Sequence, residues 1–200
     1  MKKLIAFTSA LLLSLSCFSA CSLFGDKNEN EKKEPVKKYI STFDWYRDCL
    51  VIPVSSWTGH LVEEGLIETE WNQEQKEYIS EGVGSCRVTT REGTTRYKGY
   101  IMTNSEVVPI DNINGAHKIS LDVYNPGNIA IDVSIDIVCG SKTVLSMSKT
   151  CVAKKWTTVS ATFENVSYDK VKSYVLTLEN KVNDSTFTVY LDNFYVEFAE

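Results

Sequence analysis

The feature that most constrains the fold is a strict alternation of apolar and polar residues between positions 117 and 138. Ile119, Leu121 and Val123 alternate with polar neighbours, and the turn 125–128 (Asn-Pro-Gly-Asn) follows. After this turn the alternation resumes, with apolar residues at Ile129, Ile131, Val133, Ile135 and Ile137. Successive side chains of a strand point to opposite faces, so both segments predict strands with one buried face.

The same period of two recurs toward the C-terminus and predicts an all-β protein. Residues 143–148, 157–163, 171–179 and 186–198 alternate in the same way and are separated by short turns. Short, evenly spaced strands of this kind predict an antiparallel sandwich or barrel. Beyond the N-terminal 20 residues no segment has the pattern of a long amphipathic helix, and residues 70–80 predict at most a short helical turn.

The last predicted strand changes its parity at Asp192-Asn193. Val189 and Leu191 share one face before this point, whereas Phe194 and Val196 hold the apolar positions after it. One extra residue restores the register, and a β-bulge supplies it. The alternative is that the strand passes from one sheet to the other at this point.

The first 20 residues predict a signal peptide. The apolar run Leu4–Phe18 is too short to span a membrane, which takes about 20 residues. Phe18-Ser19-Ala20-Cys21 resembles the lipobox of bacterial lipoproteins, so we expect lipid on Cys21, with Cys17 a weaker candidate. Several acyl chains on one residue anchor a protein to the outer side of a membrane without spanning it. The alternative is plain secretion.

Residues 21–38 predict a lipidated cysteine followed by a charged tether. The segment Asp26–Lys38 has five lysines, four acidic residues and a single valine, and such a composition does not bury enough apolar surface to fold. Residues 39–200 remain as one domain, of a size that buries roughly 70% of its unfolded surface.

Four cysteines fall within this domain: Cys49, Cys86, Cys139 and Cys151. An even number outside the cytoplasm favours disulfides, with three pairings open. A regular hairpin around Gly140–Lys142 would place Cys139 opposite Thr143 and Cys151 near Ile131. The two cysteines would then lie roughly 26 Å apart, too far for a bond.

Charge and composition exclude several functions. The formal net charge is −5, which disfavours nucleic acid as the main partner because phosphates would be repelled. The chain has only two histidines, which leaves little basis for a histidine-based metal centre.

Four segments, in order, resemble those of extracellular carbohydrate-binding modules: Glu81–Thr89 (EGVGSCRVT), Ile119–Asn125 (ISLDVYN), Trp156–Val159 (WTTV) and Val189–Phe194 (VYLDNF). The resemblance implies a jelly-roll β-sandwich of the galactose-binding-like type. It also implies a polysaccharide or oligosaccharide as the partner.

Proteins grip sugars by stacking aromatic rings on their CH faces and hydrogen-bonding their hydroxyls. We therefore expect a carbohydrate-binding platform among the aromatic residues in polar surroundings, namely Trp57, Trp71, Tyr97, Tyr100 and Tyr124. For each of them, packing in the core is the alternative. Trp156 and Trp45 are expected to pack rather than bind.

The resemblance also implies a structural calcium site. Modules of this type hold Ca²⁺ between an acidic residue near the first strand and the aspartate of the last one, which correspond here to Asp44 and Asp192. Asp44 stands where the family has glutamate, so its side chain is shorter by one methylene group. Calcium prefers six to eight oxygen ligands.

The sequence as a whole predicts a non-catalytic glycan-binding lipoprotein displayed outside the cytoplasm. The alternative is a surface lipoprotein of the same fold that docks another protein and binds no sugar. A small glycoside hydrolase would need two facing carboxylates, and nothing in the sequence singles out such a pair.

Overall fold

The computed structural model describes residues 35–45, 51–53, 67–90, 96–101, 112–164, 170–180, 182 and 186–199. The predicted signal peptide, Cys21, most of the predicted tether, Cys49 and Trp57 lie outside these residues. No helix among the described residues is long and apolar enough to cross a membrane.

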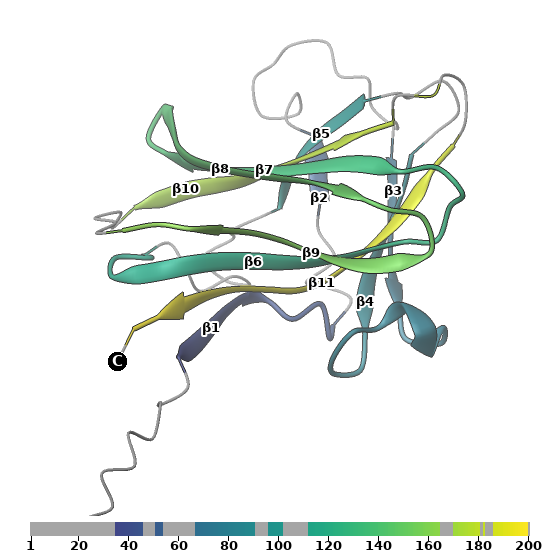
Figure 1. The fold of residues 1–200 in the computed structure, drawn as a ribbon, viewed down its shortest axis with the longest axis horizontal. Coiled ribbons are helices and arrows are strands. Elements are labelled where there is room, and N and C mark those ends of the chain that lie inside the picture. The colour runs from purple at the N-terminus through teal and green to yellow at the C-terminus, as the bar shows by residue number, and fades with distance from the viewer. Residues whose placement is uncertain are drawn as a thin grey trace, which may run out of the picture. The chain divides into compact units, whose positions relative to one another are not determined.

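The described residues form two antiparallel β-sheets that face each other (Figure 1). Sheet A has the order β3-β4-β11-β6-β9, with β1 paired to β11, and sheet B has the order β2-β5-β10-β7-β8. The strands of sheet A are β1 (Val36–Ser41), β3 (Ile67–Asn72), β4 (Ser85–Thr90), β6 (Ala116–Asn125), β9 (Lys155–Thr162) and β11 (Thr188–Phe198). Those of sheet B are β2 (Val51–Pro53), β5 (Arg96–Ile101), β7 (Ile131–Cys139), β8 (Lys142–Cys151) and β10 (Val171–Glu179).

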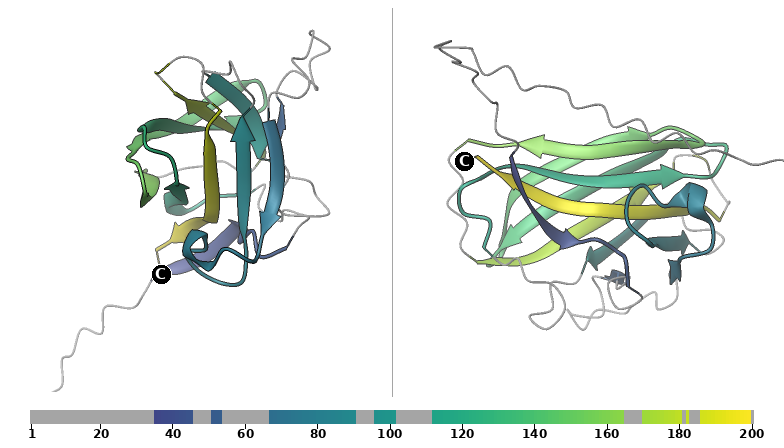
Figure 2. Two further views of the ribbon diagram at one scale, coloured as in Figure 1. Left: turned by 90° about the vertical axis from the view of Figure 1, so that its right-hand side faces the viewer. Right: turned by 90° about the horizontal axis from the view of Figure 1, so that it is seen from below.

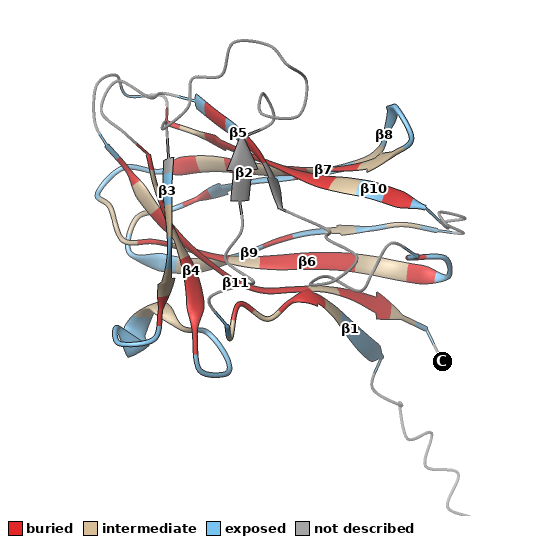
Figure 3. Ribbon diagram, turned by 180° about the vertical axis from the view of Figure 1, so that it is seen from behind, coloured by how far each residue is buried: buried red, intermediate tan, exposed pale blue. Residues whose placement is uncertain are grey.

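This arrangement confirms the predicted all-β jelly-roll sandwich. The core lies between the sheets, where the alternating apolar residues of β6 and β7 are buried. Figure 3 shows the buried positions running along β6, β7 and β11. Leu121 in sheet A and Ile135 in sheet B are fully buried, while their polar neighbours Asp122 and Asp136 are partly exposed on the outer faces. The period of two therefore sorts each strand into a core face and a solvent face.

The predicted β-bulge in β11 is also confirmed. Asp192 pairs with Asp122 and Tyr195 pairs with Ser120, so three steps on β11 match two on β6. The extra residue lets Asn193 adopt a left-handed backbone with φ of 47°. Strand β11 stays in sheet A throughout, which excludes the alternative that it passes from one sheet to the other.

The β7–β8 hairpin separates two of the cysteines, as the sequence predicts. Cys151 pairs with Ile131 at one end of the hairpin. Cys139 pairs with Lys142 instead of the expected Thr143, because the register shifts between Ile137 and Val138. Burial raises the pKa of the Cys151 thiol to about 11, so this group stays protonated and unreactive at neutral pH.

Strand β1 begins at Val36, inside the segment whose composition predicts a tether. Val36 pairs with Phe198, and the strand continues along one end of β11. The ammonium of Lys37 lies 4.6 Å from the ring centre of Tyr195, and that of Lys38 lies 4.6 Å from the ring centre of Phe198. Cation–π contacts and backbone pairing thus order lysines that the charge pattern alone assigns to solvent.

The left-handed backbone at the bulge predicts a specific stability difference. Both Asn193→Gly and Asn193→Ala remove the side-chain amide, but only alanine is strained at this φ. We expect Asn193→Ala to unfold with a free energy about 1 kcal/mol lower than Asn193→Gly, after allowing for glycine's greater freedom in the unfolded chain. Urea denaturation of the two variants measures the difference, and equal stabilities would contradict the bulge geometry.

Candidate functional site

The outer face of sheet B carries two adjacent rows of polar side chains. Pairing between strands aligns the first row as Arg96, Glu179, Asp132 and Thr150, from β5 to β8. The second row, one step along, is Lys98, Thr177, Ser134 and Ser148. Each strand contributes every second residue, because the residues between them face the core.

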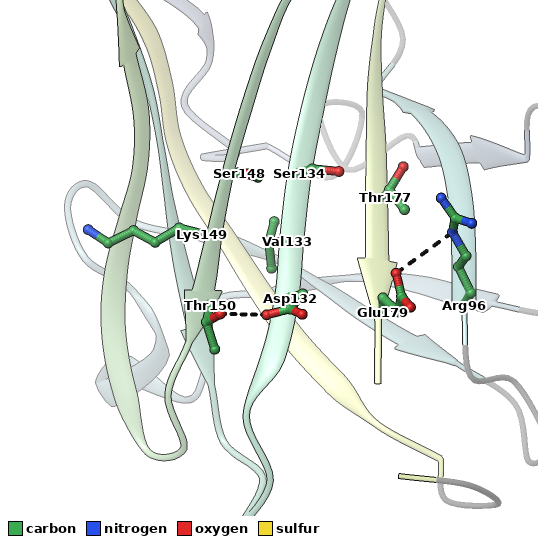
Figure 4. A pocket seen from close by; sticks show the side chains of 9 residues that line it. All are labelled: Arg96, Asp132, Val133, Ser134, Ser148, Lys149, Thr150, Thr177 and Glu179. Atoms are coloured by element: carbon green, nitrogen blue, oxygen red, sulfur yellow. Dashed lines mark hydrogen bonds and ion pairs between the residues drawn. The ribbon is translucent and has the colours of Figure 1, made fainter. Parts of the chain in front are cut away.

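All residues of these rows except Lys98 line an open pocket of about 440 Å³ (Figure 4). Its walls come from four strands and consist of Arg96, Asp132, Val133, Ser134, Ser148, Lys149, Thr150, Thr177 and Glu179. Thr177 lies on the central strand β10 and is only 7% exposed, whereas Thr150, on the edge strand β8, is exposed. The pocket lining is therefore less exposed at β10 than at the β8 edge.

The two carboxylates of the pocket are each held by a neighbour. Thr150 Oγ1 donates to Asp132 Oδ1 over 2.5 Å, and Arg96 Nε lies 3.9 Å from Glu179 Oε2. Figure 4 shows both pairs side by side in the first row. The pocket thus combines acceptors, hydroxyl groups and a guanidinium, a mixture suited to a ligand with many hydroxyls.

Sequence reasoning missed these residues as a site. The alternation predicts that Asp132 and Ser134 lie on the polar face of a strand, and it assigns them no further role. Glu179 and Arg96 gave no signal, because each is an ordinary charged residue at a strand end. The register of β5 against β10 and of β10 against β7 brings them together.

Two of the predicted platform residues lie on β5, next to the pocket. The backbone of Tyr100 pairs with Val175, one row beyond Thr177, and its side chain is outside the described part of the structure. Tyr97 has the opposite parity and is 2% exposed, so it packs in the core and offers no face to a ligand. Among the described residues, no aromatic ring lines the pocket.

Trp71 is partly buried rather than an exposed platform. It pairs with the buried Cys86 across β3 and β4 and packs against the core. Its indole Nε1 donates to the carbonyl of Phe43 over 3.2 Å. A second pocket of about 310 Å³ lies beside it, between Glu70, Gln75 and Arg87. This pocket is separate from the rows on sheet B.

Tyr124 belongs to an aromatic cluster on the outer face of sheet A. It pairs with Tyr190 on one side and with Trp156 on the other. Tyr78, from the 3-10 turn η3 (Lys76–Tyr78), lies over this row, with ring centres 4.3 Å from Tyr190 and 5.0 Å from Tyr124. Trp156, expected to pack, is half-buried at the end of this cluster, and the expected core residue Trp45 is 50% exposed.

The expected calcium ligands both hold the β3–β4 loop (residues 73–84) through backbone N–H groups. Asp44 Oδ1 accepts from Val83 N and Gly84 N, over 2.6 and 3.2 Å. The chain runs so close to this carboxylate that a Cβ on Gly82 would lie 2.3 Å from Asp44 Oδ1. The loop is therefore closed tightly over the Asp44 side chain.

Asp192 holds the preceding part of the same loop. Its Oδ2 accepts from Ser80 N over 2.8 Å, from Ser80 Oγ over 3.0 Å and from Glu81 N over 3.2 Å. Both carboxylates accept N–H groups of the loop, which cannot bind calcium. Calcium binding by Asp44 and Asp192 stays a prediction. Among the described residues, no group of three or more His, Cys, Asp or Glu side chains is placed to hold a metal ion.

The comparisons with known proteins identify the fold. No protein-family profile matches the chain, and no curated protein matches it. Among solved structures, it is similar to an exo-β-agarase, with a TM-score of 0.50 and 9% identity over 72% of this chain and 25% of the agarase.

Two other similar structures contain carbohydrate-binding modules. One is the family 22 module with the catalytic module of a Clostridium thermocellum xylanase, complexed with xylohexaose. Its TM-score is 0.49, and the identity is 16% over 82% of this chain and 29% of the xylanase chain. The other is a family 61 module bound to β-1,4-galactotriose. Its TM-score is 0.46, and the identity is 9% over 69% of this chain and 85% of the module. Identities this low bear on the fold alone, and the two structures with TM-scores below 0.5 add no argument about this chain.

The burial of Asp192 predicts a pH dependence of stability. Its side chain is fully buried, and this desolvation raises its pKa from 3.8 to about 6, although four hydrogen bonds oppose the shift. The folded protein then binds a proton more tightly than the unfolded chain. The resulting stabilisation is complete below pH 3.8 and is lost as the pH rises through 6.

We therefore expect the difference in unfolding free energy between wild type and Asp192→Asn to change by about 2 kcal/mol from pH 4 to pH 7, in favour of the variant at pH 7. Urea unfolding at several pH values measures it, and the contributions of other titrating groups cancel in the difference. Parallel curves for the two proteins would show that Asp192 does not titrate in this range.

Proposed function

We propose that this protein is a non-catalytic glycan-binding lipoprotein whose pocket on sheet B holds part of a polysaccharide or oligosaccharide. The observation that carries the proposal is the double row of polar side chains that the strands of this sheet align across an open pocket. A sugar presents a closely spaced series of hydroxyls, each able to donate and accept. The pocket supplies partners of both kinds from rigid strands, so little ordering is needed on binding.

The charge of the pocket favours a neutral, hydroxyl-rich ligand over an ion. Asp132 and Glu179 share the rows with two cations, Arg96 beside Glu179 and Lys98 beside Thr177. A strongly charged ligand of either sign would meet a like charge, whereas sugar hydroxyls can bond to both. Charge-assisted hydrogen bonds of this kind are about twice as strong as neutral ones.

The neighbours in fold are consistent with this proposal. The names of the similar structures describe binding to β-1,4-galactotriose, xylan, xylohexaose and a β-1,3-1,4-linked tetrasaccharide, and an agarase activity. These ligands define a panel of glycans with which to begin. The proposal itself stands on the pocket of this chain.

We do not propose hydrolysis. The two pocket carboxylates, Asp132 and Glu179, are direct neighbours across β7 and β10, the arrangement that a glycoside hydrolase would need in some form. Each is held in a contact that suits ligand binding, Asp132 by Thr150 and Glu179 by Arg96. Incubation with the glycan panel should release no new reducing ends.

The second part of the proposal concerns where the protein is located in the cell. The signal-like segment 1–20 and the lipobox-like Phe18–Cys21 support attachment through lipid on Cys21, with the domain on the extracytoplasmic side of the membrane. The domain would then hold glycan close to the cell. The competing function, docking of another surface protein by the same fold, requires no sugar.

The pocket predicts a specific loss of binding. We expect the double variant Asp132→Ala/Glu179→Ala to bind the retained glycan roughly 10- to 100-fold more weakly, because each carboxylate is a charged hydrogen-bond acceptor. Affinity electrophoresis on β-1,4-galactan, xylan, mixed-linkage β-glucan and agarose, with and without calcium, measures the retardation.

Asp136→Ala is the matched control for these substitutions. Asp136 lies on the same face of β7 and accepts from Ser146 Oγ over 2.5 Å, as Asp132 does from Thr150, but it is not part of the pocket lining. It should bind like the wild type. A wild type that no glycan retards would refute sugar binding and favour the protein-docking alternative.

The lipid anchor is tested in cells. We expect a radiolabelled or clickable fatty acid to be incorporated into the wild type and to be lost in Cys21→Ala, because only the thiol forms the thioether with the lipid. Cys17→Ala, which leaves Cys21 in place, should keep the label. Labelling of Cys21→Ala at the wild-type level would contradict the assignment.

A further inference from the structure

The aromatic cluster on the outer face of sheet A contains two rings, Tyr124 and Trp156, beyond the stacked pair that joins the β3–β4 loop to the sheet. Tyr78 and Tyr190 stack at 4.3 Å and join the β3–β4 loop to the sheet, and Tyr190 OH donates to Gln75 Oε1 over 2.8 Å. This contact accounts for two of the four rings. Trp156 lies two strands away from Tyr190, on β9, and its ring contact is with Tyr124 at 5.4 Å.

Three rings of this cluster have their polar atoms at the surface of the molecule. Tyr78, Tyr124 and Trp156 are half-buried, and the described residues provide no hydrogen-bond partner for either hydroxyl or for the indole N–H. Buried tyrosine and tryptophan side chains normally pair these groups, so their exposure here is typical of a surface that is apolar on its faces and wet at its edges.

A polar network lies one row along the sheet from these rings. Asp122 pairs across the strands with Asp192 and Thr158, directly beside the row of Tyr190, Tyr124 and Trp156. Thr158 Oγ1 donates to Asp122 Oδ1 over 2.6 Å, and Asn193 Nδ2 approaches Asp122 Oδ2 at 3.4 Å. Asp122 remains partly exposed and Thr158 is exposed. Hydrogen-bonding groups therefore border the aromatic surface.

Loop contacts and strand pairing hold the aromatic cluster in place. Asp44 and Asp192 fix the loop that carries Tyr78, through four backbone N–H groups between Ser80 and Gly84. Tyr124 and Trp156 stand on neighbouring strands, whose spacing is set by their backbone hydrogen bonds. Figure 2 (right) shows the sheet A side of the molecule with the turn lying against it. Rings fixed before binding lose little entropy when a ligand stacks on them.

We propose that Trp156, Tyr124 and Tyr78, with Asp122 beside them, form a second glycan-binding surface on sheet A, distinct from the pocket on sheet B. The inference rests on the proposed function, because it assigns the same class of ligand to the opposite sheet. The ligand is a sugar ring that stacks on the exposed aromatic faces and hydrogen-bonds Asp122 and the free ring tips. An apolar peptide would leave the three polar tips without partners.

Two sites on opposite sheets act together on a long polysaccharide and not on a short oligosaccharide. Binding at one site raises the effective concentration of chain segments at the other, so the polysaccharide is held more tightly than either site alone allows. Loss of the sheet A surface should therefore weaken retention by polysaccharide more than binding of an oligosaccharide to the pocket.

The test compares three proteins on the polysaccharide that retards the wild type. We expect Trp156→Ala to reduce retention about tenfold, and Asp132→Ala/Glu179→Ala to leave a residual retention that the added Trp156→Ala abolishes. Trp156→Phe, which keeps a ring, should retain more binding than Trp156→Ala, and thermal unfolding checks that both variants fold. Trp45→Ala, which removes another exposed tryptophan, is the matched control and should bind like the wild type.

The outcomes separate this inference from the proposed function. If Trp156→Ala and Tyr124→Ala bind polysaccharide as well as the wild type, or if the pocket variant alone loses all retention, the second surface is refuted and the pocket stands. If the pocket variant binds normally while Trp156→Ala loses all retention, the sheet A surface is the binding site and the pocket assignment fails. No retention of the wild type by any glycan overturns both.

Discussion

The packing of two sheets over one apolar core decides which side chains this protein can offer to a ligand. Every strand has an inner face, and the inner residues of the central strands, such as Leu121 and Ile135, are completely buried. The residues that alternate with these inner residues therefore face solvent. Functional groups in this fold therefore occur at alternate positions, in rows that cross the strands. The register of neighbouring strands determines which groups share a row.

The bulge in β11 extends this principle to a residue that the regular pattern would leave exposed. Where the extra residue is inserted, Asp192 is fully buried, and its carboxylate accepts backbone N–H groups of a loop more than a hundred residues earlier in the chain. Asp44 holds the next part of that loop. The two carboxylates thus take a structural role that resembles the one expected of a calcium site, with N–H donors where a metal would need oxygen ligands. Burial of the Asp192 carboxylate disfavours its charged form, and this desolvation raises its pKa.

The candidate binding residues show how far local patterns extend. Alternation correctly placed Asp132 and Ser134 on an outer face, but it gave no reason to join them to Glu179 and Arg96, which lie about 45 and 35 residues away in sequence. Aromatic residues were harder to assign. Tyr97 and Tyr100 differ by three positions in one strand, so they have opposite parity, and a segment rich in polar residues did not reveal that Tyr97 faces the core. Trp156 lies near the start of a strand, where the sequence predicts packing, yet its parity turns it outward beside Tyr124.

The sequence by itself determined the class of fold, most of the strands and the position of the bulge, because a period of two and its interruption are properties of neighbouring residues. Only the tertiary structure decided which residues meet. Strand order and register set the composition of the pocket on sheet B and of the aromatic surface on sheet A, and both depend on hydrogen bonds between segments far apart in the chain. Side chains from distant strands become neighbours only when the backbone pairs, and no local pattern specifies that pairing.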